Sequence, residues 1–290
     1  MIPYNITSVL PFYSNIQEQN HRRSYAYGEV YPLYCPMGEM LPFQFMTQHN
    51  QSNDVVSVKV MNMHDDEVAD ITTALQDGGM ATTKYASDGY DIVMYPAIMP
   101  MGVNLPEGRY YLVIQTSIGT YYSEVFTIVG SIAPYLKIEW KSQEDLISYG
   151  WRIQYTSGSI PFHNVLYLDT ELGKPDYVFE EQGESRDGYF FAEKQISEKT
   201  YKFQFLAPEY LCDALRFARM ADDVIVTDKY GRRYQCDTFL ITPKWQEQGD
   251  LASVEAEFQT DTIAKTIGRA IVPSAAGGDF NNDYNNDFNN

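Results

Sequence analysis

Carboxylates make up most of the side chains in this sequence that could do chemistry, and two groups of them resemble metal sites. In the first, His64 is followed directly by Asp65, Asp66 and Glu67, and imidazole and carboxylate groups both bind transition metals. A solvated turn at the end of a strand would give the same residues. We favour the turn, because acidic runs beside strands are more often exposed than metal-bound.

The second group is the C-terminal sequence DFNNDYNNDFNN, in which Asp279, Asp283 and Asp287 lead three four-residue units. D-F-N-N-D matches the first five positions of a calcium-binding loop. The sixth position of such a loop requires glycine, but here it is Tyr284 or Phe288, and no glutamate follows at the twelfth. The match is partial, and we predict no metal or other cofactor.

A further acidic cluster, in FEEQGESRDGY, contains enough carboxylates for glycoside hydrolysis, which needs two. Glu180 and Glu181 are neighbours, and neighbouring residues of a strand point to opposite faces, so these two cannot converge on one bond. We interpret EEQGESRDG as a long solvated hairpin loop. The sequence has no G-x-S-x-G, P-loop, H-E-x-x-H or dinucleotide-binding glycine pattern. We therefore predict no catalytic residues and no enzymatic activity.

The charge balance limits the partners that the surface can attract. The chain has 290 residues, with 39 Asp and Glu against 21 Lys and Arg, which gives a net charge of −18. Such a surface repels nucleic acids and anionic lipids. No apolar run approaches the roughly 18 residues of a membrane helix. We expect neither a sequence-specific nucleic acid nor a membrane among its partners.

The cysteines and the first residues indicate where the protein folds. Cys35, Cys212 and Cys236 are far apart and odd in number, which predicts three buried thiols rather than disulfides or a zinc site. The sequence MIPYNITSVLPFYSN lacks the basic and apolar regions of a secretory signal. We expect folding in a reducing cytosol.

Short alternating runs separated by Gly, Pro and Asn predict a mainly β protein. Examples are DVVSVKVMNM (54–63), with Val56, Val58 and Val60 on one face, LPEGRYYLVIQTS (105–117) and YYSEVFTIVG (121–130). Their spacing is typical of an antiparallel sandwich, which we place at residues 26–131 and expect to be immunoglobulin- or fibronectin-like. An extended arm, residues 1–25, precedes it.

A change of pattern around Pro134 predicts a domain boundary near residues 131–135, followed by a second β domain over residues 135–270. Within it, Leu211, Leu215 and Ala218 recur at three- and four-residue spacing, which predicts a helix over 209–221 with these residues buried. The sequence KYGR predicts the turn of a later hairpin.

The last segment, residues 271–290, is too polar to bury its own surface. Phe280, Tyr284 and Phe288 recur there every four residues, and we predict that they anchor this tail on a neighbouring subunit or an adjoining protein of the same assembly. The chain also contains 24 tyrosines. Tyrosine suits both half-buried strands and contact surfaces, and composition leaves both interpretations open.

The second half of the chain resembles a family of viral proteins. The stretch from LYLDTELGKPDYVFEEQGESRDGYFFAEKQ through EYLCDALRFARMADDVIVTDKYGRRY to PKWQEQGDLASVEAEF is similar to structural proteins of tailed phages and prophages of gut bacteria, in particular the crAss-like phages. The similarity covers about residues 135–265, and YYSEVFTIV fits it as well.

The resemblance implies a virion protein made in the host cytoplasm, with the role of a tail ring or collar subunit. It further implies a homo-oligomeric ring, with a dodecamer as one expected size, and neighbours such as portal-proximal or other tail proteins. No catalytic residues come with it. The alternative is a carbohydrate-binding or adhesin-type sandwich that uses Trp140, Trp151 or tyrosine rings as sugar platforms.

Overall fold

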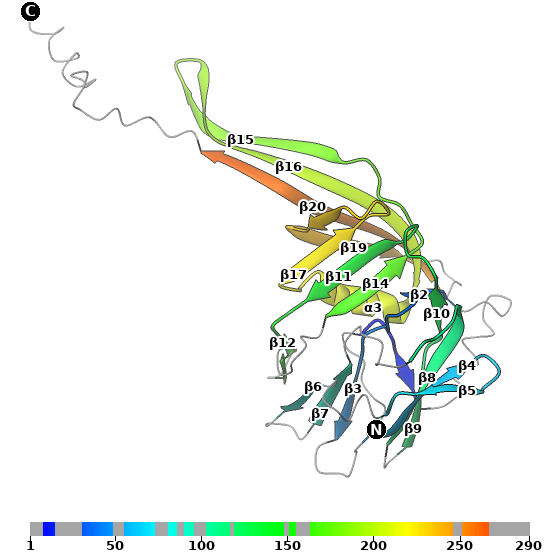
Figure 1. Ribbon diagram of the computed structural model, residues 1–290. Coiled ribbons are helices and arrows are strands. Elements are labelled where there is room, and N and C mark those ends of the chain that lie inside the picture. The colour runs from blue at the N-terminus through cyan, green and yellow to red at the C-terminus, as the bar shows by residue number, and fades with distance from the viewer. Residues whose placement is uncertain are drawn as a thin grey trace, which may run out of the picture. The chain divides into compact units, whose positions relative to one another are not determined.

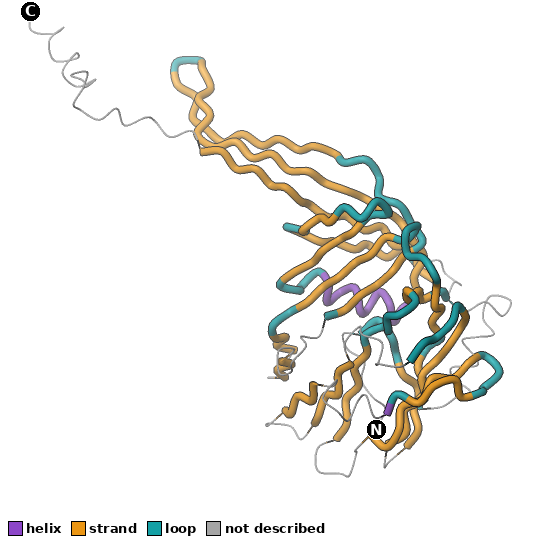
Figure 2. The backbone as a smooth tube through the Cα atoms, in the orientation of Figure 1, coloured by secondary structure: helices purple, strands orange, loops and turns teal. Residues whose placement is uncertain are grey.

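The part of the chain that the computed structural model describes is mainly β-structure, as the sequence predicts (Figure 1, Figure 2). The described residues are 8–14, 31–48, 55–72, 81–85, 90–95, 103–116, 119–147, 151–154, 163–245 and 251–266.

The largest sheet lies in the first half of the chain and has seven strands. Its main path is β1-β9-β8-β10-β2, and β4, which pairs with β8, adds β5. The strands are β1 (Phe12–Tyr13), β2 (Leu33–Pro36), β4 (Val55–Asn62), β5 (Glu67–Asp70), β8 (Gly108–Thr116), β9 (Gly119–Ser123) and β10 (Phe126–Val129). The β2–β10 pair is parallel and the other pairs are antiparallel.

Strand β4 shows how far sequence alternation fixes which side chains are buried. Val58 and Val60 are fully buried, as the alternating pattern predicts. Val56, predicted to share their face, is 52% exposed. The ladder between β4 and β8 shifts between Val55 and Ser57. A register shift of this kind exchanges the side chains that point inward with those that point outward on the far side of the shift.

Residues 8–14, which belong to the predicted arm, pack against the strands of the same chain. Val9 and Leu10 are fully buried, and β1 pairs with β9. The Ser8 hydroxyl donates to the carbonyl of Pro42 at 3.2 Å. The Phe12 ring lies 5.4 Å from that of Phe43, the first residue of a three-stranded antiparallel sheet. That sheet contains β3 (Phe43–Gln48), β7 (Tyr90–Tyr95) and β6 (Ala81–Tyr85), in this order.

The second half of the chain begins with a four-stranded antiparallel sheet in the order β14-β11-β17-β18. These strands are β11 (Leu136–Lys141), β14 (Asn164–Leu168), β17 (Asp223–Thr227) and β18 (Arg233–Gln235). Leu136, Ile138 and Trp140 of β11 alternate inward, and every residue of β14 is buried. A separate antiparallel pair contains β12 (Glu144–Ile147) and β13 (Trp151–Gln154).

The predicted helix is confirmed as α3 (Glu209–Ala218), and its buried residues include Leu211, Leu215 and Ala218, as predicted. Cys212 and Ala214 are buried as well. Pro208 precedes the helix in an extended conformation. The helix ends three residues before the predicted 221, where the Met220 N–H bonds to the Phe217 carbonyl in a tighter turn.

The predicted turn at KYGR joins β17 to β18 and is organised by Asp228. The Asp228 carboxylate accepts backbone N–H bonds from Tyr230 and Arg232 at 2.9 and 3.0 Å, and it pairs with the Arg232 guanidinium at 2.7 Å. Gly231 adopts the positive φ of 77° that closes the turn. Burial raises the pKa of Asp228, but these hydrogen bonds outweigh burial and hold the pKa below its usual range.

The last sheet contains four strands in the order β15-β16-β20-β19. They are β15 (Asp176–Arg186), β16 (Tyr189–Pro208), β19 (Thr238–Lys244) and β20 (Leu251–Thr266). The hairpin predicted around EEQGESRDG exists, but the long loop does not, because EEQGESR belongs to β15. Only Asp187 and Gly188 connect the strands, with φ of 51° and 82°. An Asp-Gly pair suits a two-residue turn with positive φ at both positions, so no longer loop is needed.

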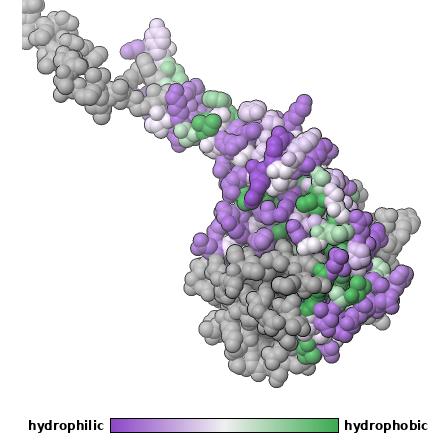
Figure 3. Space-filling view, viewed as in Figure 1, coloured by the Kyte–Doolittle hydropathy of each residue, from purple (hydrophilic) through white to green (hydrophobic). Residues whose placement is uncertain are grey.

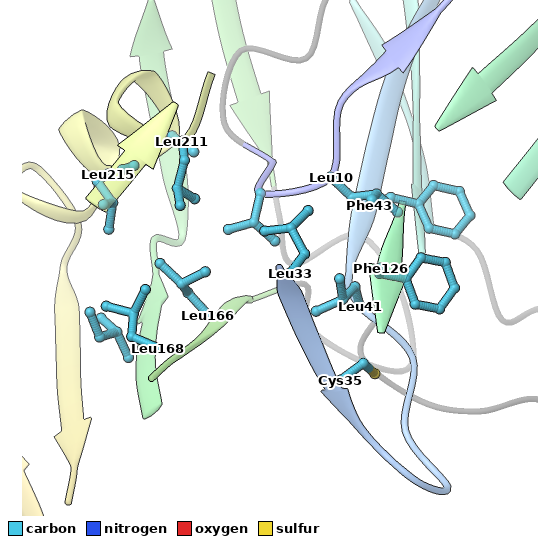
Figure 4. Packing of buried hydrophobic residues seen from close by; sticks show 14 of the residues in the cluster. Leu10, Leu33, Cys35, Leu41, Phe43, Phe126, Leu166, Leu168, Leu211 and Leu215 are labelled. Atoms are coloured by element: carbon cyan, nitrogen blue, oxygen red, sulfur yellow. The ribbon is translucent and has the colours of Figure 1, made fainter. Parts of the chain in front are cut away.

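The chain divides into two compact units. Unit 1 comprises Met1–Asp176 and Thr200–Thr260, and unit 2 comprises Tyr177–Lys199 and Asp261–Asn290. Within unit 1, a single apolar cluster joins residues from both halves of the chain, including Leu33, Phe126, Leu166 and Leu215 (Figure 4). The predicted boundary at 131–135 lies inside unit 1 and stays a prediction.

Replacing Leu215 with alanine should destabilise the protein by about 2–5 kcal/mol, the range for a buried leucine. Leu215 is fully buried in the α3 stripe. The measurement is urea unfolding followed by circular dichroism, with Met220→Ala, a side chain that is 65% exposed, as the control. A loss below about 1 kcal/mol in Leu215→Ala would contradict the packing of α3, since surface changes stay near 0.5 kcal/mol.

Asp228→Asn should cost about 1–3 kcal/mol at neutral pH, because the amide loses a charge-assisted pair with Arg232. The lowered folded-state pKa means that Asp228 stabilises the fold above its unfolded pKa of about 3.9, and that this contribution disappears as pH falls through the folded value. The difference between wild type and variant should therefore shrink in acid. Urea unfolding at pH 7 and near pH 3 tests this, with the exposed Asp213→Asn as control; an equal loss at both pH values would refute it.

Candidate functional site

The acidic run at His64 forms an exposed turn between β4 and β5. The Asn62 side-chain oxygen accepts the N–H groups of His64 and Asp66 at 2.8 and 3.0 Å. Asp65 has a positive φ of 64°, and its carboxylate accepts a 2.7 Å bond from the Tyr111 hydroxyl. The turn interpretation is thus confirmed. Within the described ranges, no group of three or more His, Cys, Asp or Glu residues is placed to hold a metal ion.

The acidic residues of the predicted cluster are exposed on the β15–β16 hairpin: Glu180, Glu181, Glu184 and Asp187. Glu181 accepts a 2.6 Å bond from the Gln195 side chain of β16. Glu180 is adjacent in β15 and exposed, so strand alternation directs it to the other face. The carboxylates of Glu180 and Glu181 therefore face away from each other and do not converge on one point.

The three thiols are free, and burial suppresses their ionisation. Cys35 and Cys212 are buried as predicted, whereas Cys236 is only half-buried. Burial raises the pKa of Cys212 to about 11 and that of Cys236 to about 12, and it raises the pKa of Cys35 as well. Because the thiolate is the reactive form, none of these side chains is prepared to act as a nucleophile at neutral pH.

Trp140, a predicted sugar platform, is buried with 3% of its surface exposed, so that expectation is wrong for this ring. Trp140 belongs to β11, and its side chain packs in the apolar core of unit 1. The side chain of Trp151 and the anchors Phe280, Tyr284 and Phe288 lie outside the described residues. The prediction for the tail therefore stays a prediction.

Some of the tyrosines are buried in the protein interior. Tyr111 and Tyr167 are almost fully buried, and their hydroxyls donate to the carboxylates of Asp65 and Glu39 at 2.7 and 2.9 Å. Tyr13 likewise donates to buried Glu124 at 3.1 Å. These rings fit the interpretation as strand residues that pack inside the fold.

Other aromatic residues gather on unit 2, where nothing in the described chain covers them. We call residues 177–199 and 261–266 the ribbon. Its exposed large apolar side chains are Tyr177, Val178, Phe179, Tyr189, Phe190 and Ile263. Tyr177 and Phe179 are 70% and 69% exposed. Hydrophobic groups lie among polar ones along these strands in the space-filling view (Figure 3).

The ribbon differs from an ordinary sheet because none of its described residues is buried. An antiparallel sheet in a soluble domain normally packs one face against a core. Strand β20 illustrates the contrast, because its residues alternate between buried and more exposed positions up to Thr260 and are all exposed from Asp261 to Thr266. The ribbon is a folded surface without a core of its own.

Alternation along the strands places two of the exposed rings on the same side of the ribbon. The bond between Glu181 and Gln195 puts these side chains on one face. Tyr177 and Phe179 lie four and two residues before Glu181, so they share that face. Lys199, four residues after Gln195, shares it too and pairs with Asp261 at 3.7 Å. The face therefore combines two exposed rings with charged and polar groups, as protein interfaces do.

Sequence reasoning missed this surface, because it assigned most of the hairpin to a loop. The usable signal was the Asp187–Gly188 pair between two aromatic-containing runs, which is typical of a tight hairpin.

No protein-family model matches this chain, and no curated protein sequence matches it. In the described part of the structure, no helix has both the length and the apolar character needed to cross a membrane. The ribbon is the candidate site that the geometry provides.

Proposed function

We propose that this protein is a structural assembly protein, and that the ribbon is the surface through which copies of the chain associate. The observation that carries the proposal is the ribbon itself: an ordered sheet that exposes Tyr177, Phe179 and four further large apolar side chains and buries none of its described residues. Exposed large apolar side chains that gather on one folded element mark a candidate interaction site.

The energetics favour such a use of the ribbon. Burying an aromatic or large aliphatic side chain contributes about 1.5–3 kcal/mol. Because the strands are already folded, association orders few further groups, and the entropic cost of binding is lower than for a segment that folds on contact. Aromatic residues are enriched at the centres of protein interfaces for the same reason.

The resemblance to crAss-like phage proteins gives this assembly role a setting. The chain would be a tail ring or collar subunit that forms a homo-oligomeric ring in the virion and contacts neighbouring tail proteins, without catalytic activity. A net charge of −18 is compatible with packing near encapsidated DNA without adhering to it. The immunoglobulin-like assignment of residues 26–131 and the division into two domains belong to the same proposal.

The double variant Tyr177→Ser, Phe179→Ser should weaken self-association while leaving the folded protomer intact. Both rings are about 70% exposed, so the change should alter protomer stability by no more than about 0.5 kcal/mol. Sedimentation velocity over a range of concentrations measures association, and thermal unfolding measures stability.

Tyr230→Ser is the matched control for Tyr177→Ser, because Tyr230 is 72% exposed but belongs to the β17–β18 turn of unit 1. The control should associate like the wild type. A wild-type chain that stays monomeric at high concentration and binds glycans on an array would contradict the assembly role and support the carbohydrate-binding alternative.

Deleting residues 279–290 tests the predicted anchors Phe280, Tyr284 and Phe288. The expected result is an unchanged melting temperature and weaker assembly, since the three rings contribute only when a neighbour covers them. A point-mutated chain with Phe280, Tyr284 and Phe288 replaced by serine should behave like the deletion. Assembly equal to that of the full chain in both variants would show that the tail is not an anchor.

A further inference from the structure

Exposed apolar side chains lie on both faces of the ribbon, not on one face alone. Consecutive residues of a strand point to opposite faces. Tyr177, Val178 and Phe179 follow one another in β15 and are all exposed, so the two aromatic rings lie on one face and the valine lies on the other. Near the turn, the consecutive residues Tyr189 and Phe190 of β16 are exposed as well, and they too point to opposite faces. Each face of the ribbon therefore has apolar groups to cover.

The two faces differ in the size of these side chains. We call the face with Tyr177 and Phe179 the front face, and the face with Val178 the back face. Gln195 lies on the front face through its bond to the β15 glutamate described above, so the next residue, Ile196, points to the back. Ile196 is partly exposed. Near the base of the ribbon, the front face presents large aromatic rings and the back face presents smaller branched side chains.

A single kind of contact can cover both faces only if it joins the front face of one ribbon to the back face of another. A front-to-front or back-to-back contact is two-fold, pairs identical surfaces and leaves the other face of both ribbons exposed. A front-to-back contact leaves one front face and one back face uncovered at the ends of each pair, so further copies add until the row closes. Heterologous contacts of this kind build closed assemblies with cyclic symmetry.

The sizes of the opposed side chains favour the same arrangement. Stacked sheets lie about 10 Å apart, and their side chains interdigitate best when large groups face small ones. Front-to-front stacking would set aromatic rings against aromatic rings. Back-to-back stacking would set only small side chains against each other. Front-to-back stacking places the rings of Tyr177 and Phe179 against Val178 and Ile196.

Charge near the base of the ribbon agrees with this arrangement. Lys199 lies on the front face, because it is four residues after Gln195, and its neighbour Glu198 lies on the back face. Neighbouring copies in a cyclic assembly point the same way along its axis, so Lys199 of one copy comes to the level of Glu198 of the next. Towards the turn, Lys194 on the back face offsets the charge of Glu180 there.

From these features we infer that the ribbons of successive copies of this chain stack front to back, with Tyr177 and Phe179 of one copy packed on Val178 and Ile196 of the next. This inference rests on the proposed assembly role, and it specifies the partner surface and the direction of the contact. Charged side chains can keep their ends in water at the edges of such a stack, because the ribbon is only three strands wide, in the order β15-β16-β20 (Figure 1).

Two variants that each damage one face test the direction of the contact. The double variant Tyr177→Ser, Phe179→Ser damages the front face, and Val178→Asp damages the back face. In a sample of either variant alone, every front-to-back contact includes a damaged face. Each variant should therefore associate roughly tenfold or more weakly than the wild type, since it loses apolar contacts or buries an unpaired charge.

The back-face variant has a matched control and a second version. Val68 of β5 belongs to unit 1 and is as exposed as Val178, 41% against 42%, so Val68→Asp should associate like the wild type. Val178→Asn removes the apolar contact without adding a charge and should act in the same direction as Val178→Asp. Thermal unfolding of each variant verifies that the protomer is folded.

A mixture of the two face variants provides the decisive measurement. The double variant supplies an intact back face, and Val178→Asp supplies an intact front face, so one contact can form between them. The mixture should give a one-to-one complex of two chains and nothing larger, because the two faces that stay uncovered are both damaged. Sedimentation velocity with one variant fluorescently labelled measures the size and the composition of the complex.

The outcomes separate this inference from the proposed function. Variants that stay dissociated when mixed refute front-to-back stacking and leave the assembly role of the ribbon standing. A Val178→Asp chain that associates like the wild type, while the double variant does not, has the same meaning. If the wild type stays monomeric, or if both variants associate like the wild type, both proposals are wrong. Dissociated single variants that form a one-to-one complex on mixing support both.

Discussion

Burial of a single apolar cluster in unit 1 is the constraint on which the described fold depends. α3 contributes Leu211 and Leu215, β14 contributes Leu166 and Leu168, and the sheet of the first half of the chain contributes Leu33 (Figure 4). None of these elements could bury its apolar side chains alone, because a single layer of secondary structure needs a second layer to cover it. The shared cluster holds together strands that are more than a hundred residues apart in sequence.

Two buried tyrosines form specific polar contacts between distant segments of unit 1. The Tyr167 hydroxyl of β14 reaches Glu39, in the segment after β2, at 2.9 Å, and Tyr13 of β1 reaches buried Glu124 at 3.1 Å. A buried carboxylate is costly without a donor. These bonds therefore add specificity to a contact whose free energy comes mainly from apolar burial. They also give part of the tyrosine content a structural role in the interior.

The ribbon has strands of which none of the described residues is buried, and this contrast with unit 1 is the basis of the functional argument. Backbone hydrogen bonds and a tight Asp187–Gly188 turn are enough to define the hairpin locally. A sheet with both faces exposed is marginal in water unless something covers it. The exposed rings of the ribbon are the observation that supports the proposed contact with another chain.

The sequence by itself determined the local features of this protein. It predicted α3 and its buried Leu211 and Leu215, the KYGR turn and the mainly β class, because these depend on periodicity and turn chemistry within a few residues. It did not predict that Val56 is exposed, that Trp140 is buried, or that EEQGESR is a strand. Those properties depend on a register shift against β8, on packing in the shared cluster and on pairing between β15 and β16. Only the tertiary structure decided them, since each requires a partner that is distant in sequence or a geometry that composition does not encode.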